Sequence, residues 1–294
     1  MKEKILIIGG DSTMAKFLIP QLNKENFEFV LTTRSRKKVS KSKIFLDLTK
    51  IDKFVVPKKT NSAIVLAGID GHEKCKKNYN YSYLINSICV PNLIKKLIIK
   101  KVFVCFVNTS AIFSKTSNLP KENSQHYPSQ GYGMQKSIAE KKIINFAKKG
   151  NKLNMLSILR VTKNVHTFTK IFNSWIKNIN KRKKFSALKD LFFAPISYYD
   201  TAKLLLKIIK KKQSGIMHLS GEKDISYYNF AKRLLIYNNF NPNLAIPSNS
   251  YEEKKILINS NQFTALCMKK TSKKLKIKPV KILKIIKLIS SEIN

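Results

Sequence analysis

Acidic residues are scarce in this sequence. Only 17 of its 294 residues are Asp or Glu, against 57 Lys or Arg, which gives a formal net charge of +40. The carboxylates are scattered, and the histidines are not spaced as pairs of metal ligands; they are His72, His126, His166 and His218. These shortages disfavour a zinc enzyme and a hydrolase that works with two carboxylates, so we predict no metal site.

Long apolar runs and cysteine motifs are also missing. No run approaches the roughly 18–20 apolar residues of a membrane span, and the N-terminal segment MKEKILIIGG turns to glycine too early for a secretory signal. The cysteines lack CxxC spacing and stand in apolar segments, which indicates reduced packing residues; they are Cys75, Cys89, Cys105 and Cys267. We therefore expect a cytoplasmic protein without a membrane span.

Apolar residues, in contrast, make up 43% of the chain and aromatic residues 10%, enough for a large core. Short apolar strands alternate with helical segments over the first 160 residues. The expected strands lie at 4–8, 27–33, 43–48, 62–68, 101–110 and 154–161. This alternation predicts an α/β fold with a doubly wound parallel sheet, covered by helices on both faces.

The alternation loosens after Val165. We therefore predict a first domain at 1–165 and a smaller α/β lobe at 166–294. Strands near 192–198 and 215–220 are expected to return from the lobe to the first domain.

The turn at residues 9–15 lies where the first strand gives way to a helix, and it reads GGDSTMA. Free backbone N–H groups and the helix dipole make such a turn an anion site. Gly9, Ser12 and Ala15 occupy the spacing at which dinucleotide folds place three glycines, so that the backbone can approach a pyrophosphate. The turn indicates a dinucleotide site, with an ordinary strand-to-helix turn as the alternative.

The second strand ends in Thr32-Thr33-Arg34-Ser35-Arg36. Folds that bind NAD usually place an acidic residue here for the ribose 2′-hydroxyl. This segment holds no acid to repel a 2′-phosphate, and its guanidinium groups could hold one. It favours NADP over NAD, although any loop of so basic a chain would be basic.

Tyr132 and Lys136 are four residues apart on one face of an expected helix. The ammonium would favour the phenolate and lower the pKa of Tyr132 toward the range useful for proton transfer. The helix follows the fifth strand, which ends in Asn108-Thr109-Ser110 at the edge of the sheet where ligands bind. The same spacing recurs at Tyr199/Lys203, Tyr228/Lys232 and Tyr251/Lys255, which we interpret as solvated helix faces.

These motifs resemble the extended short-chain dehydrogenase/reductase superfamily, in its nucleotide-sugar-modifying branch. The likeness covers most of the chain and rests on GGDSTMA at 9–15, Asp47-Leu48, LAG at 66–68, Asn86, NTSAIF at 108–113, YGMQK at 132–136 and ILRV at 158–161. Residues 215–234 are most similar to the sugar-nucleotide-binding reductases related to dTDP-4-dehydrorhamnose reductase. Ser12 and Ala15 replace glycines of the family, and Val161 replaces a proline.

The resemblance implies a role for each matched residue. Tyr132 would be the acid/base, Lys136 would lower its pKa and hold the nicotinamide ribose, and Thr109 would position the substrate carbonyl. Asn86 would support the structure around Lys136. The first domain would be a Rossmann-type dinucleotide-binding domain, and the lobe mainly substrate-binding. The implied cofactor-binding residues are Gly9, Ser12, Thr13, Met14, Ala15, Thr33, Arg34, Asp47, Leu48, Ala67, Gly68, Tyr132 and Lys136.

Three reactions share this scaffold. Dehydratases of the branch resemble one another in an Asp-Glu pair after the threonine, where this chain has Ser110-Ala111. Epimerases of the branch typically retain NAD, whereas a net reductase draws on exchangeable NADPH. We predict NADPH-dependent reduction of a keto group, at C4, on a nucleotide-linked sugar. An NAD(P)-dependent epimerase is the alternative, and NAD is the alternative cofactor.

Substrate contacts and partners are less constrained. Lys163, Asn164 and Trp175 lie where the branch usually binds the nucleotide diphosphate, with packing of the lobe as the alternative for Trp175. The branch suggests a homodimer. Remoter alternatives are a non-catalytic dinucleotide-binding protein and a nucleic-acid-binding protein. Because lysines are dispersed and no nucleic-acid-binding motif occurs, we predict no nucleic-acid partner.

Overall fold

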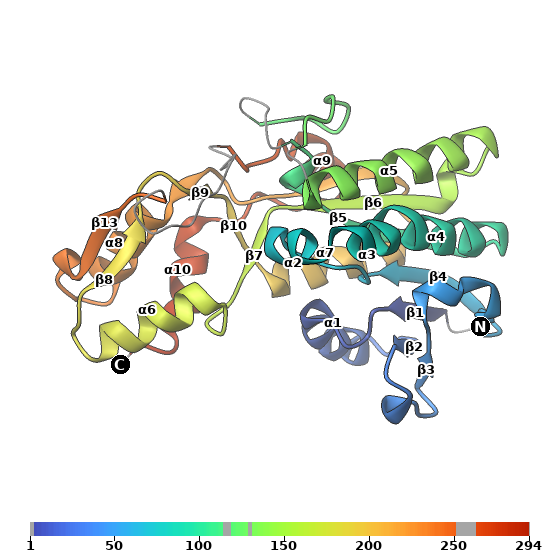
Figure 1. The fold of residues 1–294 in the computed structure, drawn as a ribbon, viewed down its shortest axis with the longest axis horizontal. Helices are drawn as coiled ribbons and strands as arrows, with labels where there is room; N and C mark the ends of the chain where they lie inside the picture. Colours follow the sequence, from blue (N-terminus) through green and yellow to red (C-terminus); the bar gives the residue numbers. More distant parts are fainter. Residues whose placement is uncertain (1–2, 114–118, 129–130, 251–262, 294) are drawn as a thin grey trace. The chain divides into compact units, whose positions relative to one another are not determined.

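The computed structural model describes residues 3–113, 119–128, 131–250 and 263–293 (Figure 1). The chain forms two compact units, each built from three segments. Unit 1 comprises Met1–Ile112, Pro128–Arg160 and Thr201–Met217, and unit 2 comprises Phe113–Tyr127, Val161–Asp200 and His218–Asn294. The units therefore interleave along the sequence, where a single boundary at 165/166 was predicted.

A seven-stranded sheet is the largest in the molecule, with the order β11-β6-β5-β4-β1-β2-β3. Parallel ladders join β1 to β2 and β4, β2 to β3, and β4 to β5. Because the chain winds outward from β1 in both directions, the predicted doubly wound fold is confirmed. The strands are β1 (Lys4–Ile8), β2 (Glu28–Thr33), β3 (Lys43–Phe45), β4 (Thr60–Val65), β5 (Phe103–Thr109), β6 (Leu156–Val161) and β11 (Gly215–Leu219).

The central strand shows why these apolar runs become buried strands. Successive side chains of a strand point to opposite faces. Leu6 and Ile8 pack in one cluster with Leu93 of α4 and Ile143 of α5, whereas Ile5 and Ile7 point to the other face, and all are fully buried. The helices with residues in unit 1 are α1 (Thr13–Lys24), α2 (His72–Lys77), α3 (Tyr79–Tyr83), α4 (Val90–Ile99), α5 (Tyr132–Lys149) and α7 (Tyr198–Lys211), with a π-helical turn at Leu84–Cys89 and 3-10 turns at Arg36–Lys38, Leu48–Lys53, Ser110–Phe113 and Leu153–Met155.

Unit 2 contains three two-stranded sheets around an aromatic core. The strand pairs are β7 (Lys163–Val165) with β10 (Pro195–Ser197), β9 (Phe192–Phe193) with β12 (Ile225–Ser226), and β8 (Phe185–Leu188) with β13 (Ala245–Ser248). Its helices are α6 (Lys170–Asn180), α8 (Tyr227–Tyr237), α9 (Lys269–Leu275) and α10 (Ile282–Ser290), with a 3-10 turn at Pro242–Leu244.

The two strands predicted to return to the large sheet differ in outcome. β11 lies at the edge of that sheet beside β6. Residues 192–198 do not join it, because they form β9 and β10, which pair with β12 and β7. Pro195 begins β10, and a proline has no N–H to donate, so this segment suits a short pair better than the interior of a large sheet.

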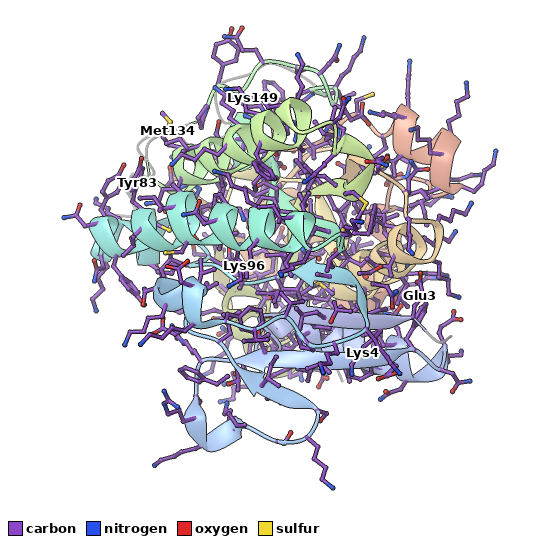
Figure 2. All side chains as sticks on the ribbon, turned by 90° about the vertical axis from the view of Figure 1, so that its right-hand side faces the viewer. Glu3, Lys4, Tyr83, Lys96, Met134 and Lys149 are labelled. Carbon is purple, nitrogen blue, oxygen red and sulfur yellow. The ribbon has the colours of Figure 1, made fainter. Side chains whose placement is uncertain are left out.

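The positive charge is spread over the surface. Figure 2 shows nitrogen-tipped side chains on several sides of the view. Two of the lysines that it labels, Lys4 and Lys96, have local partners. Lys4 pairs with Glu28 at 3.1 Å, and the Lys96 ammonium donates to the Ile51 carbonyl oxygen at 2.9 Å. In the part of the chain that the structure describes, no helix is long and apolar enough to cross a membrane.

An ion pair between Arg160 and Glu140 is buried in unit 1. Arg160 of β6 and Glu140 of α5 are 1% and 0% exposed, and the guanidinium donates to both carboxylate oxygens, with the Arg160 Nε at 3.1 and 3.2 Å. The Asn108 amide of β5 donates to the same carboxylate. A buried charge requires such compensation, so this cluster fixes α5 to β5 and β6.

We expect Arg160→Met to lower the free energy of unfolding by about 3–5 kcal/mol, because it leaves the Glu140 carboxylate buried without a counter-charge. Lys210→Met is the matched control, since its pair with Glu25 is 42% and 45% exposed on its two side chains. That variant should cost at most about 1 kcal/mol. Urea unfolding measures both, and equal losses would contradict the role of burial.

Candidate active site

The glycine-rich turn has the geometry of a phosphate-binding loop. Gly9 has φ +90°, and a Cβ there would lie 2.9 Å from the Ala67 nitrogen, so only glycine fits between β1 and the end of β4. Ser12 is the N-cap of α1, because its hydroxyl accepts from the Ala15 N–H at 3.2 Å. The first-turn N–H groups of Thr13 and Met14 have no partner within the helix and point along its axis. The loop therefore fits a pyrophosphate despite the loss of two glycines.

The end of β2 is tied to that loop. The Thr32 hydroxyl accepts from the Gly9 N–H at 2.9 Å. The Thr33 hydroxyl donates to the Asp11 carboxylate at 2.6 Å and accepts from the Ser35 N–H at 3.1 Å, while Arg34 is exposed between them. The end of β2 itself holds no acidic residue, but the fold brings the Asp11 carboxylate to it from the glycine-rich turn.

Two further predicted cofactor residues follow β3. The Asp47 carboxylate caps the 3-10 helix Leu48–Lys53 by accepting from the Thr49 N–H at 2.9 Å. Leu48 is half-buried and packs against the core of unit 1. Both residues thus shape the chain after β3, beside the strand end that carries Thr33.

Asn86 joins the segment after β4 to α5. Its side chain accepts from the Ile69 N–H at 2.8 Å and donates to the Ile69 carbonyl at 2.9 Å. It also donates to the Gln135 side chain at 2.9 Å. Gly68 lies against this amide and has φ +153°. A Cβ at Gly68 would lie only 3.0 Å from the Asn86 Oδ1, so a side chain there would crowd the amide. Asn86 thereby links Ile69, which follows Ala67 and Gly68, to Gln135, which precedes Lys136.

The start of α5 is pressed against the end of β5. Gly133 is buried, and a Cβ at this position would collide with the Ala111 carbonyl oxygen. The Ala111 N–H donates to the Thr109 hydroxyl oxygen at 3.2 Å, which leaves the hydroxyl proton of Thr109 to donate elsewhere. A glycine directly after Tyr132 thus lets the helix begin beside Thr109.

Tyr132 meets both Thr109 and Asp70. Burial, the negative charge of Asp70 and a hydrogen bond from the phenol to that carboxylate raise the pKa of Tyr132 well above its usual value, and a hydrogen bond from Thr109 opposes them. The predicted lowering of this pKa is wrong for this structure, because desolvation and the charge and hydrogen bond of Asp70 raise it. The phenol is therefore protonated at neutral pH. The His72 ring packs edge-on to it, with centroids 5.6 Å apart.

Lys136 lies one helical turn further along α5, and its side chain is buried. Its ammonium donates to the Val107 carbonyl at 3.2 Å and lies 4.3 Å from the centroid of the Phe106 ring. Burial lowers the pKa of Lys136 to about 8, although the charges of Asp70 and Glu140 oppose the shift. The ammonium is consequently held at the carboxyl end of β5, on the same helix face as Tyr132.

Comparison with known proteins identifies the family of the chain. The sequence profile of a family described as RmlD substrate binding domain matches residues 2–288. The chain belongs to this family. The predicted resemblance to nucleotide-sugar-modifying short-chain dehydrogenases/reductases is thereby confirmed at the level of family and fold. No curated protein sequence matches the chain.

Solved structures share the RmlD-type fold over nearly the whole chain. A dTDP-4-dehydrorhamnose reductase from Bacillus anthracis, in complex with NADP, is 20% identical with a TM-score of 0.81, covering 99% of this chain and 100% of that one. The Clostridium acetobutylicum reductase is 21% identical with a TM-score of 0.79, covering 98% and 99%. A UDP-glucose 4-epimerase from Thermotoga maritima is 13% identical with a TM-score of 0.77, covering 98% of each chain.

The predicted substrate residues lie in unit 2. Lys163 is exposed and Asn164 half-buried, both in β7. Trp175 is 2% exposed among Phe172, Phe185 and Tyr227, and its indole N–H donates to the Ser186 carbonyl at 3.3 Å. Its ring is used in packing, the alternative given for it above.

Sequence reasoning missed three carboxylates of unit 1. Glu140 could have been found, because it follows Lys136 by four residues on the same helix face. Asp70 follows the end of β4, so the strand-end rule that selected Thr109 also points to it. Asp11 stood inside the quoted loop, but its contact with Thr33 spans 22 residues and has no local signal. Within the described residues, no group of three or more His, Cys, Asp or Glu side chains could hold a metal ion.

We expect Asp70→Asn to lower the pKa of Tyr132, because the substitution removes the charge that penalises the phenolate. Burial would remain, so the value should stay above that of free tyrosine. Ultraviolet titration of tyrosinate, taken as the difference between each protein and its Tyr132→Phe version, measures this. Asp52→Asn, at an exposed carboxylate on the helix Leu48–Lys53, is the control and should change nothing. An unchanged titration in Asp70→Asn would refute the assignment.

Proposed function

We propose that the protein is an NADPH-dependent reductase of a keto group, at C4, on a nucleotide-linked sugar. The observation that carries this proposal is the meeting of Tyr132 with Thr109 at the carboxyl end of β5, with the Lys136 ammonium one turn away. Proton donation to a carbonyl oxygen needs an acid, and a second donor and a positive charge nearby stabilise the charge that develops. Membership of the RmlD family supports this reading.

Each residue of the site then has one task. The Thr109 hydroxyl, oriented by the Ala111 N–H, would turn from Tyr132 to donate to the carbonyl oxygen of a bound substrate. NADPH, when bound, supplies the hydride to the carbonyl carbon. Tyr132 delivers its proton to the oxygen as negative charge develops there, and the transfer is favourable because an alkoxide is far more basic than a phenolate. Asp70 is exposed, so the proton can return from solvent through its carboxylate.

The raised pKa of Tyr132 suits a role as the acid of a reduction better than a role as a base. A phenol that stays protonated at neutral pH can act as an acid in every turnover. The Lys136 ammonium stabilises the phenolate that remains after proton transfer and is placed to bind the nicotinamide ribose. An epimerase would instead need the tyrosine as a base in its first step, which the charge of Asp70 opposes.

The dinucleotide would lie along the carboxyl ends of β1, β2 and β4. The first turn of α1 would hold its pyrophosphate, Asp47 and Leu48 its adenine, and Ala67 and Gly68 its central part. Thr33 and Arg34 would face the 2′-phosphate, which makes NADPH the proposed reductant. We assign the sugar nucleotide to unit 2, through Lys163 and Asn164, and propose that the chain forms a homodimer in the cytoplasm.

Tyr132→Phe should reduce turnover at least about 100-fold, because it removes the acid and leaves the ring in place. Binding of the dinucleotide should change little. The assay is loss of NADPH absorbance with a panel of nucleotide-linked 4-keto sugars, alongside calorimetric titration with NADPH. Tyr228→Phe is the control, since Tyr228 also precedes a lysine by four residues, with the Lys232 ammonium 5.7 Å from the centroid of its ring. Full turnover by Tyr132→Phe would refute the mechanism.

Arg34→Ala should weaken NADPH about tenfold, the effect of one charge-assisted contact, and leave NADH unchanged. Arg36→Ala provides the matched control, because the Arg36 guanidinium stacks 4.3 Å from the centroid of the Phe45 ring. Dissociation constants of both dinucleotides for the three proteins decide the question. If wild type and Arg34→Ala show the same preference, the assignment of the 2′-phosphate to Arg34 is wrong.

A further inference from the structure

Asp11 is the acidic residue of the glycine-rich turn, and its carboxylate is directed to the end of β2. One oxygen accepts from the Thr33 hydroxyl at 2.6 Å. The other accepts from the Lys43 ammonium at 3.2 Å, with the Lys38 ammonium 3.8 Å away. A third of the side chain is exposed. The Thr33 hydrogen bond and the two ammonium groups lower the pKa of Asp11, so it is a carboxylate at neutral pH.

These contacts occupy the donors that a 2′-phosphate would use. In dinucleotide folds the adenosine ribose lies at the end of the second strand, where Thr33 stands. The Thr33 hydroxyl already donates to Asp11 and accepts from the Ser35 N–H. A phosphate has only acceptors to offer here, so it competes with the Asp11 carboxylate for Thr33 and Lys43 and is repelled by it. A ribose 2′-hydroxyl can donate to that same carboxylate.

We propose that Asp11 is a specificity-determining residue, which weakens binding of a 2′-phosphorylated dinucleotide relative to one with a free 2′-hydroxyl. Asp11 lies in the loop after β1, and it plays the role that an acidic residue at the end of β2 has in NAD-binding folds. It opposes Arg34, and the two charges together set how far NADPH is preferred over NADH. This inference rests on the proposed function only in placing a dinucleotide at this loop.

Fragments of the cofactor test the proposal without any turnover. Calorimetric titration with 2′,5′-ADP and with 5′-AMP gives a ratio of dissociation constants for each protein. Asp11→Asn keeps the shape of the side chain and removes its charge, so it should favour 2′,5′-ADP over 5′-AMP by about tenfold more than wild type, a difference of about 1.4 kcal/mol. Asp52→Asn removes the same charge from an exposed site elsewhere and should leave the ratio unchanged.

A second variant guards against local distortion of the loop. Lys43→Met leaves the backbone of the turn intact and removes one counter-charge from Asp11. It should weaken 2′,5′-ADP more than 5′-AMP, because both the attraction by Lys43 and the compensation of Asp11 are lost.

The outcomes separate this proposal from the reaction. An unchanged ratio in Asp11→Asn, with both fragments binding to wild type, overturns the role of Asp11 and leaves the dinucleotide site standing. A shifted ratio without reductase activity upholds Asp11 and removes the proposed reaction. If wild type binds neither fragment, both proposals fall.

Discussion

The buried ion pair between Glu140 and Arg160 holds α5 in place, and the geometry of the candidate active site depends on it. Glu140, Lys136 and Tyr132 follow one another at four-residue intervals along α5, so they share one face. Anchoring Glu140 to β6 fixes the rotation of that face, and with it the direction in which the Tyr132 phenol points. The same carboxylate offsets part of the cost of burying the Lys136 ammonium. The Glu140 carboxylate in unit 1 thus both pairs with Arg160 and acts on the Lys136 ammonium.

The proposed reaction makes two opposing demands on Tyr132. Its phenol must stay protonated before the reaction, which burial and Asp70 favour. It must also tolerate a negative charge once the proton has left, and the buried Lys136 ammonium, one helical turn away, is the positive charge that α5 offers for this. The segment after β4 therefore helps to set the pKa of the proposed acid, through Asp70.

The sequence predicts the sheet and the pairing of Thr109 with Tyr132, because both follow from local rules. Apolar runs such as residues 4–8 have no face for solvent, and the carboxyl ends of parallel strands meet at one edge. The direction of the Tyr132 pKa and the environment of Thr33 could not be predicted. Each depends on a carboxylate from another segment, Asp70 or Asp11, whose position is set by the packing of whole strands. For residues 192–198, apolar character suggested a strand of the large sheet, but hydrogen-bonding capacity decided against it.

The Asn86 side chain has a mechanical consequence. It is bonded to both backbone groups of Ile69 and to Gln135, and Gln135 is bonded in turn to Ser82. Displacing the 66–70 segment while Asn86 stays bonded to Gln135 would break the two hydrogen bonds between Asn86 and the Ile69 backbone together. The 66–70 segment and the start of α5 are therefore coupled through Asn86 and Gln135. A ligand that pushed on the first would also load the helix that carries Tyr132.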